Sequence, residues 1–372
     1  MKNKAWIEEL DYIRGLAFLA VVMQHSLGVF IRYPVCTLQE QMTLGIIFNL
    51  VKFSVPAFMF ISGLVMVYNY SQGIKPLNFY QKRWKEIFIP YLLWSLIYST
   101  YYNWNSLDRV YEGKSFVYNL LTGSASYHLW FVVLIMQWYF VFPLLVSFFR
   151  WMGERKTRIL GAVLWGAIVY TVIVWWSYRI APCMTAKQPG WWLQLVKFRD
   201  RNLIMWFFYF LTGGAVAYML PGWRTCLKKR AIFVFMGWAV LLVIVTGELF
   251  NTLAGSRVNL NISTSLKPSM FVYTVFSLAL VYMAGLRFAA AQVSWYSKLL
   301  KYVGRYSLGA YFVHALGLVV AVRCMMFLWP SFAQMLLLAT GTAFLLSSAL
   351  SVLFTHVVSR LPYGRWLTGT VR

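Results

Sequence analysis

The sequence predicts an all-α polytopic membrane protein with about ten transmembrane helices, and three observations lead to this fold class. Hydrophobic residues make up 60% of the chain and charged residues only 12%, whereas a soluble domain carries about 25% charged residues. The apolar residues form long uninterrupted runs. The Lys and Arg residues gather mainly in the gaps between these runs. We therefore expect a multi-pass protein of the cell (inner or plasma) membrane.

Ten apolar runs are long enough to cross a bilayer core of about 30 Å. They are residues 14–33, 52–70, 86–104, 128–149, 158–177, 203–220, 231–250, 269–289, 306–328 and 335–358. The N-terminal segment lacks the small-residue cleavage site of a signal peptide, so the first run is expected to stay in the mature protein. No composition shift suggests a second domain, and residues 1–372 are expected to form a single integral membrane domain.

The basic residues predict the orientation of the chain. Alternate gaps hold 22 Lys and Arg residues on one side against 11 on the other, with Lys52 near a helix start. Cytoplasmic loops carry such an excess, so both termini are expected in the cytoplasm. The net charge of +24 is therefore attributed to the basic loops that set the membrane topology. It does not indicate nucleic-acid binding, because the basic–aromatic motifs of RNA-binding modules are not found.

The first apolar run carries the most informative polar residues. In LDYIRGLAFLAVVMQHSLGVF (10–30), Arg14 and His25 are eleven residues apart and leave the same side of a helix. At a rise of about 1.5 Å per residue, His25 lies ~16 Å deeper than Arg14, near mid-membrane. Ionisable groups at that depth usually mark a functional path. The alternative is that Arg14 marks the helix boundary and His25 makes a core hydrogen bond. Asp11 is expected to pair with Arg14.

Polar residues in two other apolar runs are also candidates for a functional role. His314 is predicted to lie mid-membrane, on one helix face with Ser307 and Tyr311. His128 and Trp130 begin the fourth run. They either contact a ligand or simply lie at the membrane–water interface as a polar residue with an aromatic neighbour.

Four cysteines, without CxxC spacing or histidine clusters, predict no metal site. Cys36 and Cys183 are both expected on the outer side, where a disulfide is possible.

Several motifs resemble the acyltransferase-3 family of integral membrane acyltransferases. Asp11-x-x-Arg14-Gly15 followed by His25 is similar to its first-helix signature. Further similar stretches follow in the family's order: SVPAFMFISGLVM (54–66), FYQKRWKEIFIPY (79–91), HLWFVVLIMQWYFVFPLL (128–145), FYFLTGGAVAYM (208–219) and YSLGAYFVH (306–314). The chain most resembles short members that act on surface polysaccharides, including those that modify the intercellular-adhesion polysaccharide. Gln137 departs from the pattern, because many members have an acidic residue there.

The resemblance implies transfer of an acyl group, most simply acetyl, from cytoplasmic acyl-CoA to a hydroxyl of a cell-surface glycan or glycolipid. His25 would be the general base, since a neutral imidazole can take the hydroxyl proton. Arg14 would orient the donor, and acyl-CoA would be a co-substrate with no cofactor bound permanently. Whether transfer is direct or passes through an acyl-histidine stays open.

The remaining site residues follow from the same resemblance. Lys82 and Arg83 are candidates for binding the phosphates of acyl-CoA, although a basic run at a helix start is equally typical of positive-inside anchoring. His128, Trp130, Tyr311 and His314 are candidates for binding the acceptor.

The sequence leaves two other functions to compare with acyl transfer. The main alternative is a polysaccharide transporter or flippase, which would favour intramembrane acidic residues and paired broken helices. A glycan synthase is a possible partner, but a purely structural role beside one gives the buried histidines no task.

Overall fold

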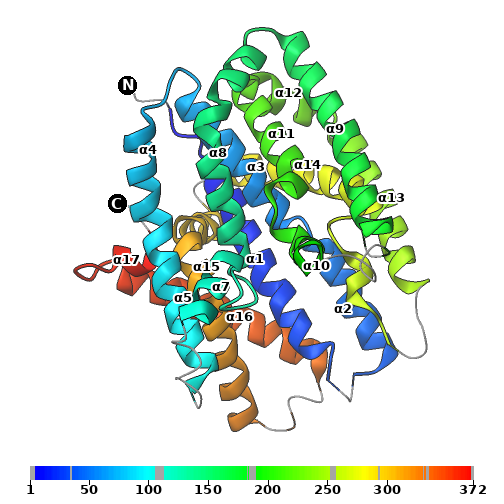
Figure 1. The fold of residues 1–372 in the computed structure, drawn as a ribbon. Helices are drawn as coiled ribbons and strands as arrows, with labels where there is room; N and C mark the ends of the chain where they lie inside the picture. The colour runs from blue at the N-terminus through cyan, green and yellow to red at the C-terminus, as the bar shows by residue number, and fades with distance from the viewer. Residues whose placement is uncertain are drawn as a thin grey trace. The chain divides into compact units, whose positions relative to one another are not determined.

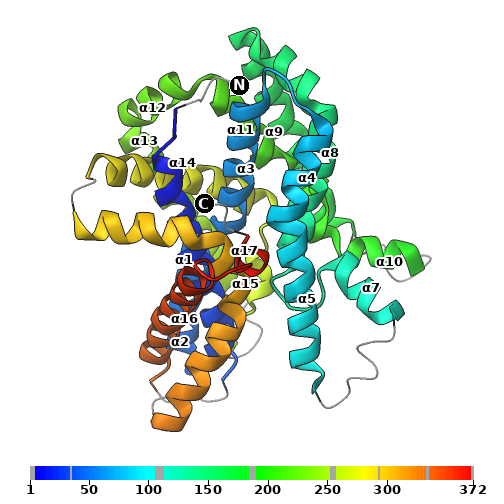
Figure 2. The same cartoon turned by 90° about the vertical axis from the view of Figure 1, so that its left-hand side faces the viewer.

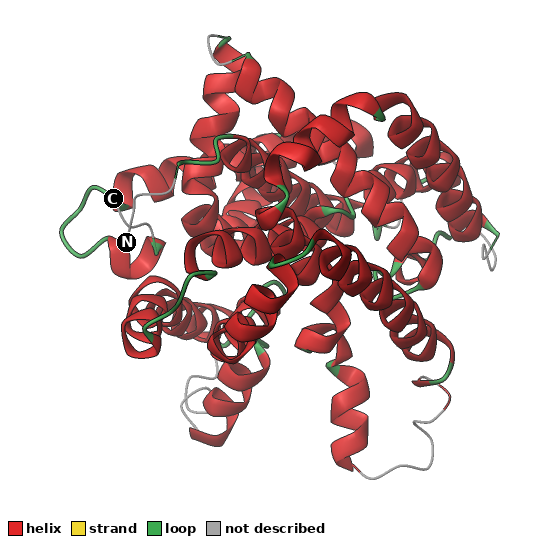
Figure 3. Ribbon diagram, turned by 90° about the horizontal axis from the view of Figure 1, so that it is seen from above, coloured by secondary structure: helices red, strands yellow, loops and turns green. Residues whose placement is uncertain are grey.

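In a computed structural model of the protein, the described residues are 5–33, 36–104, 113–181, 183, 190–251, 257–291, 294–329, 331 and 335–369. In these residues the regular elements are all helices, and no strand occurs (Figures 1 and 3). Long apolar helices dominate, so the predicted all-α polytopic membrane fold is confirmed. The described chain divides into two compact units.

The first unit contains residues Met1–Ile61 and Met219–Leu353. Its helices are α1 (Glu9–Phe30), α2 (Leu38–Leu50), the start of α3 (Ser54–Tyr70), α12 (Leu220–Lys229), α13 (Ala231–Phe250), the 3-10 turn η6 (Leu260–Ser263), α14 (Pro268–Ala290), α15 (Trp295–Leu328) and most of α16 (Leu336–Val358). Within it α1 packs mainly on α15 and α14, and α13 packs on α14 (Figure 2).

The second unit contains residues Ser62–Tyr218 and Phe354–Arg372. Its elements are the rest of α3, α4 (Pro76–Arg83), the π-helical turn η1 (Trp84–Phe88), α5 (Ile89–Tyr102), α7 (Gly113–Thr122), α8 (Trp130–Gly153), α9 (Lys156–Arg179), α10 (Gly190–Lys197), the 3-10 turns η4 (Arg199–Arg201) and η5 (Leu203–Trp206), α11 (Phe207–Tyr218), the end of α16, and α17 (Arg365–Thr368). Here α11 packs on α9 and α8, while α17 packs on α5.

The number of spans differs from the expected ten. Among the described residues eight helices are long and apolar enough to cross a membrane, and a ninth is obtained if η5–α11 and α12 together form one span. The expected span 86–104 is represented by α5, which has only 14 residues. It continues from α4 through the π-helical turn, where Lys85 and Glu86 lower the hydropathy. The structure also shows α2, which the sequence interpretation had not predicted.

The crossing of α1 and α15 is unusually close because both helices carry a glycine there. A Cβ on Gly15 would lie 2.7 Å from the Leu300 backbone oxygen, and a Cβ on Gly304 would overlap the Asp11 carbonyl. Close approach at small residues is typical of membrane helix pairs. On the opposite side of α1, Ile13 fills the space above Gly285 of α14. These contacts make α1 the central helix of the first unit.

The orientation with both termini in the cytoplasm stays a prediction, and reporter fusions can test it. Fusions at residues 74, 118, 154, 190 and 226 should report inside, outside, inside, outside and inside, because the basic gaps alternate in that order. Two neighbouring fusions that report the same side would contradict the orientation.

Gly304→Ala should lower the thermal stability of the purified protein in detergent. The added methyl group meets backbone, which cannot rotate away, and overpacking of this kind costs about 1–3 kcal/mol. Gly28→Ala is the matched control on α1, because nothing lies within 4 Å of a Cβ there. It should leave the melting temperature unchanged or raise it slightly. Equal melting temperatures for the two variants would show that the crossing is looser than described.

Candidate active site

The packing of α1 on α15 brings two histidines together in the first unit. The imidazole rings of His25 and His314 stack with centroids 5.2 Å apart and planes inclined by 28°. His25 follows Gly15 by ten residues and His314 follows Gly304 by ten, so one parallel register of the two helices accounts for both contacts. Ten helical residues rise about 15 Å. The histidine pair therefore lies well inside the apolar length of both helices.

The surroundings of His314 fix which ring nitrogen carries its proton. His314 is 0% exposed, and its Nδ1 lies 2.6 Å from the backbone oxygen of Tyr311. A carbonyl oxygen can only accept, so Nδ1 donates and the lone pair of the neutral ring is on Nε2. The Tyr311 ring packs on the imidazole at 5.4 Å, and Phe18 of α1 meets it edge-on at 6.5 Å. Ser347 of α16 donates to the His314 carbonyl at 3.1 Å, which holds α16 beside this ring.

His25 is the more accessible ring of the pair, because it is only partly buried. Its neighbour Gln24 donates from Nε2 to the Val51 carbonyl at 2.7 Å and to Ser54 Oγ at 2.6 Å. These bonds tie α1 to the break between α2 and α3. Lys52 lies in that break, within electrostatic range of His25.

Lys52 is a candidate residue that sequence reasoning missed. It was set aside as a helix-boundary cation, although it is the one charged residue between Gln41 and Tyr70. A second missed feature is the ion pair between Lys267 Nζ and Glu248 Oε2, 2.6 Å apart, with Lys267 only 3% exposed. It joins the end of α13 to the start of α14. The sequence signal was weak, because the two residues are 19 positions apart at helix ends.

Arg14 pairs with Asp11, as predicted. Arg14 Nη1 lies 2.9 Å from Asp11 Oδ1, and the Trp6 indole donates to Asp11 Oδ2 at 3.0 Å. The aspartate thus holds the guanidinium at the N-terminal end of α1. The Arg14 side chain stays 27% exposed, so it remains reachable by a ligand.

A second carboxylate near this end of α1 has a different role. Glu9 is 3% exposed and accepts two bonds from Arg224 of α12, at 2.7 and 2.9 Å. The Tyr282 hydroxyl of α14 donates to the same carboxylate at 2.8 Å. Because a planar guanidinium and a carboxylate match as a fork, this network fixes α1 to α12 and α14.

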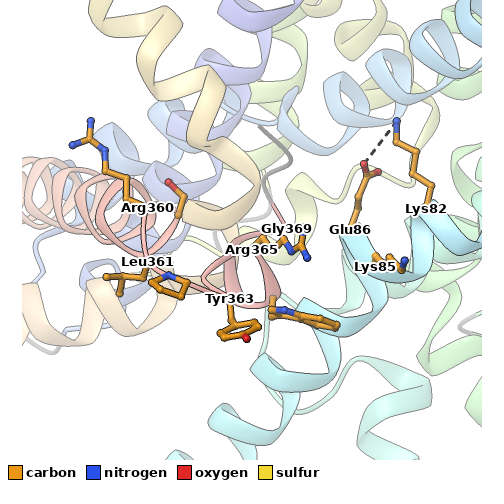
Figure 4. Close-up of a pocket in the computed structure, with 11 residues that line it drawn as sticks. Lys82, Lys85, Glu86, Arg360, Leu361, Tyr363, Arg365 and Gly369 are labelled. Atoms are coloured by element: carbon orange, nitrogen blue, oxygen red, sulfur yellow. Dashed lines mark ion pairs between the residues drawn. The ribbon is translucent and has the colours of Figure 1, made fainter.

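In the second unit, the side chains of Lys82 and Arg83 have different surroundings. Arg83 donates to Glu86 Oε2 at 2.8 Å, and its guanidinium lies 5.3 and 5.0 Å from the Phe79 and Tyr139 ring centroids. Lys82 is 55% exposed and lies 3.8 Å from Glu86 Oε1. Lys82 lines a cavity in this unit, and Arg83 is not among the cavity's lining residues (Figure 4). Binding of acyl-CoA by either residue stays a prediction.

His128 is buried rather than presented at a surface. It is 1% exposed, lies 3.1 Å by Nδ1 from Ser126 Oγ, and packs edge-on against Tyr98 and Tyr127 with centroids 5.1 and 5.4 Å apart. Helix α8 begins two residues later, at Trp130. The aromatic surroundings match a polar group held inside a packed cluster. Contact of His128 and Trp130 with an acceptor stays a prediction.

The amide at Gln137 has a clear structural task. Its Nε2 donates to the Arg201 carbonyl at 2.7 Å, and its Oε1 accepts from the Leu203 backbone N–H at 3.0 Å. A carboxylate could not make the first bond, so the amide suits this chain's backbone between η4 and η5. Burial raises the pKa of the neighbouring Asp200 carboxyl, and Arg201 partly offsets that effect.

The possible disulfide is not formed. Cys36 in the first unit is a buried free thiol, and Cys183 in the second unit is an exposed one. Their shared expected side of the membrane was the only reason to consider the bond, and sequence alone cannot supply the required geometry.

Comparison with known proteins identifies the family. A family model described as an acyltransferase domain matches residues 7–356. A candidate membrane-bound acyltransferase of Bacillus subtilis, YfiQ, is 34% identical over 87 residues, which are 23% of this chain and 24% of YfiQ. A Staphylococcus aureus protein named a probable poly-beta-1,6-N-acetyl-D-glucosamine export protein is 24% identical over 258 residues, 65% of this chain and 67% of that protein.

The similarity covers different shares of the chain in the different comparisons. The chain matches only about a quarter of the length of YfiQ, so activity and partners are not transferred from that relative. No solved structure matches the chain. The family model, in contrast, covers nearly all of the sequence and includes Arg14, His25 and His314. The chain therefore belongs to the acyltransferase-3 family of membrane acyltransferases.

Proposed function

We propose that this protein transfers an acyl group, most simply acetyl, from cytoplasmic acyl-CoA to a hydroxyl of a cell-surface glycan or glycolipid in the plasma membrane. The observation that carries the proposal is the stacked pair of His25 and His314 inside the apolar length of α1 and α15. An acyltransferase needs a base at the acceptor hydroxyl, and imidazole is the side chain best suited to that task near neutral pH.

His25 is the general base. It takes the proton of the acceptor hydroxyl as the hydroxyl oxygen bonds to the thioester carbonyl carbon. The carbon–sulfur bond then breaks, and the leaving thiolate of coenzyme A receives the proton from the His25 imidazolium. This step is assigned to His25 because this residue is partly exposed, whereas His314 is fully buried.

His314 and Tyr311 line the acceptor side of the same centre. With Nδ1 of His314 donating to the Tyr311 carbonyl, Nε2 can accept a hydrogen bond. The stacked contact holds the His25 ring in one orientation, which favours reaction by positioning. Lys52 adds a positive charge near the site and would stabilise negative charge on the thioester oxygen.

The donor is bound by cations expected on the cytoplasmic side. Arg14, oriented by Asp11, binds the donor at the entrance to α1. Lys82 and Arg83 contribute positive charge in the last turn of α4, which leads into α5 through η1. His128 and Trp130 are the proposed acceptor contacts in the second unit. A glycan is the favoured acceptor class because relatives carry a polysaccharide in their names.

A second candidate function is glycan export, alone or beside a glycan synthase, because the staphylococcal relative is named for export. The two functions differ in what they need. Translocation requires two compartments, whereas acyl transfer proceeds in detergent solution. Movement of labelled acetyl from acetyl-CoA onto a soluble oligosaccharide acceptor by purified protein in detergent therefore tests the enzyme directly. Absence of transfer, with glycan movement across proteoliposomes, would favour export.

His25→Ala should reduce this transfer by about 10²–10⁴, the usual contribution of a general base. His25→Gln should not restore it, because an amide hydrogen-bonds but cannot take the proton. Release of free coenzyme A would be measured with acceptor present, alongside thermal stability. Near-full turnover by a folded His25→Ala protein would remove His25 from the mechanism.

His314→Asn should distinguish the role of Nδ1 from the role of Nε2 in His314. The asparagine amide keeps an N–H donor for the Tyr311 carbonyl and removes the group at Nε2. We expect a melting temperature close to that of the unmodified protein and a turnover at least about tenfold lower, equivalent to loss of one good hydrogen bond. A large fall in melting temperature with turnover intact would instead assign His314 a packing role.

A further inference from the structure

A cavity of about 790 Å³ lies within the second unit and includes Lys82, one of the proposed donor contacts, in its lining (Figure 4). One wall is the junction of α4 with the π-helical turn η1, and the other is the C-terminal segment, residues 359–369. Its volume lies in the range of small-molecule sites, about 300–1,000 Å³. Four cationic side chains line it, from both walls: Lys82, Lys85, Arg360 and Arg365.

The positive charge of this cavity is only partly neutralised. Glu86 is its one acidic lining residue, and this carboxylate already pairs with Arg83 at 2.8 Å and Lys82 at 3.8 Å. Within the described part of the chain, Lys85 and Arg365 form no ion pair with a carboxylate. Figure 4 shows Lys85 on the α4–α5 wall and Arg365 opposite it, while the head group of Arg360 points away at the far edge. Lys85 and Arg365 are therefore the cations available to an anion.

The C-terminal wall is anchored to the second unit. The Trp94 indole of α5 donates to the Leu367 carbonyl at 2.8 Å. A Cβ on Gly364 would overlap the Val358 carbonyl, so only glycine permits this turn. The backbone that carries Arg365 is thus anchored on both sides, at Gly364 and at Leu367.

Two backbone irregularities lie at the cavity. Lys85 and Glu86 belong to the π-helical turn, a feature found frequently at functional sites. Tyr363, on the opposite wall, has a φ of 62°, which is uncommon for a residue other than glycine. Tyr363 is 79% exposed and, with Trp366, gives the cavity aromatic surface beside the cations. Strain and an exposed aromatic group at one place indicate a binding site.

We propose that this cavity binds phosphate esters, with the phosphate between Lys85 and Arg365 and the rest of the ligand against Tyr363 and Trp366. Arginine and lysine with nearby aromatic rings recognise phosphate groups attached to a ring or an apolar body. Two sources share this chemistry: the nucleotide end of a coenzyme A donor and the headgroup of an anionic phospholipid. Only the first source rests on the proposed function.

The test compares Lys85→Gln/Arg365→Gln with Arg155→Gln/Lys156→Gln, in the full-length protein. The control removes the same two residue types from exposed positions at the start of α9, outside the cavity. The probes are coenzyme A, adenosine 3′,5′-bisphosphate and pantetheine, measured by calorimetry in detergent. Nanodiscs of phosphatidylglycerol or phosphatidylcholine form the lipid arm, with retention of phosphatidylglycerol measured after purification.

We expect the cavity variant to bind coenzyme A and adenosine 3′,5′-bisphosphate at least about tenfold more weakly, and the control to bind them normally. Pantetheine, which lacks phosphate, should be unaffected. Loss of phosphatidylglycerol retention with nucleotide binding unchanged would identify the lipid as the source. Unchanged binding of both phosphate sources, or equal losses in the control, would overturn the proposal.

Two further measurements keep the outcome clear. Lys85→Gln alone changes an exposed side chain and should fold normally, so it serves if the double variant is unstable. Binding is measured without acceptor, and turnover is measured separately with acceptor. Binding of adenosine 3′,5′-bisphosphate that depends on the cavity, in a protein without acyl transfer, would support this site and contradict the proposed function.

Discussion

The close parallel crossing of α1 and α15 is the constraint on which the rest of the first unit depends. Gly15 and Gly304 let the two backbones meet where any side chain would hold them apart. One consequence is that side chains ten residues further along both helices lie at matching heights. His25 and His314 therefore lie level with each other and stack. A fixed helix pair positions reacting groups better than loops do.

The polar side chains of this unit differ in the role that their contacts suggest. Glu9 is engaged by Arg224 and Tyr282 together, which accounts for its burial in structural terms. A buried ion pair contributes little net stability, because desolvation offsets the attraction. Such a pair fixes which helices meet. His25 is partly exposed and lies near Lys52, and the proposed function gives it a chemical role.

Sequence periodicity predicted the long apolar helices and placed His25 and His314 inside them, because a hydrophobic run and a histidine within it are local signals. The stacking of the two rings was not predicted, since it depends on the packing of α1 on α15. The α5 span was overestimated because hydropathy does not reveal the π-helical turn that separates α4 from α5. Arg83 was grouped with Lys82 because they are neighbours in sequence, yet adjacent helical side chains point about 100° apart. The cavity pairing of Lys85 with Arg365 could not be predicted, since 280 residues separate them and only tertiary structure joins them.

The depth of His25 bears on the nature of the acyl donor. Arg14 and His25 lie on one helix, and their spacing corresponds to a rise of about 16 Å. A donor whose phosphates stay with cations at the membrane surface needs a long, uncharged arm to present its carbonyl carbon at that depth. The pantetheine arm of coenzyme A meets this requirement. An acyl phosphate does not, because its charge would have to enter the apolar interior at high cost. In the proposed reaction, the spacing of these two residues therefore suits an acyl-CoA donor better than an acyl phosphate.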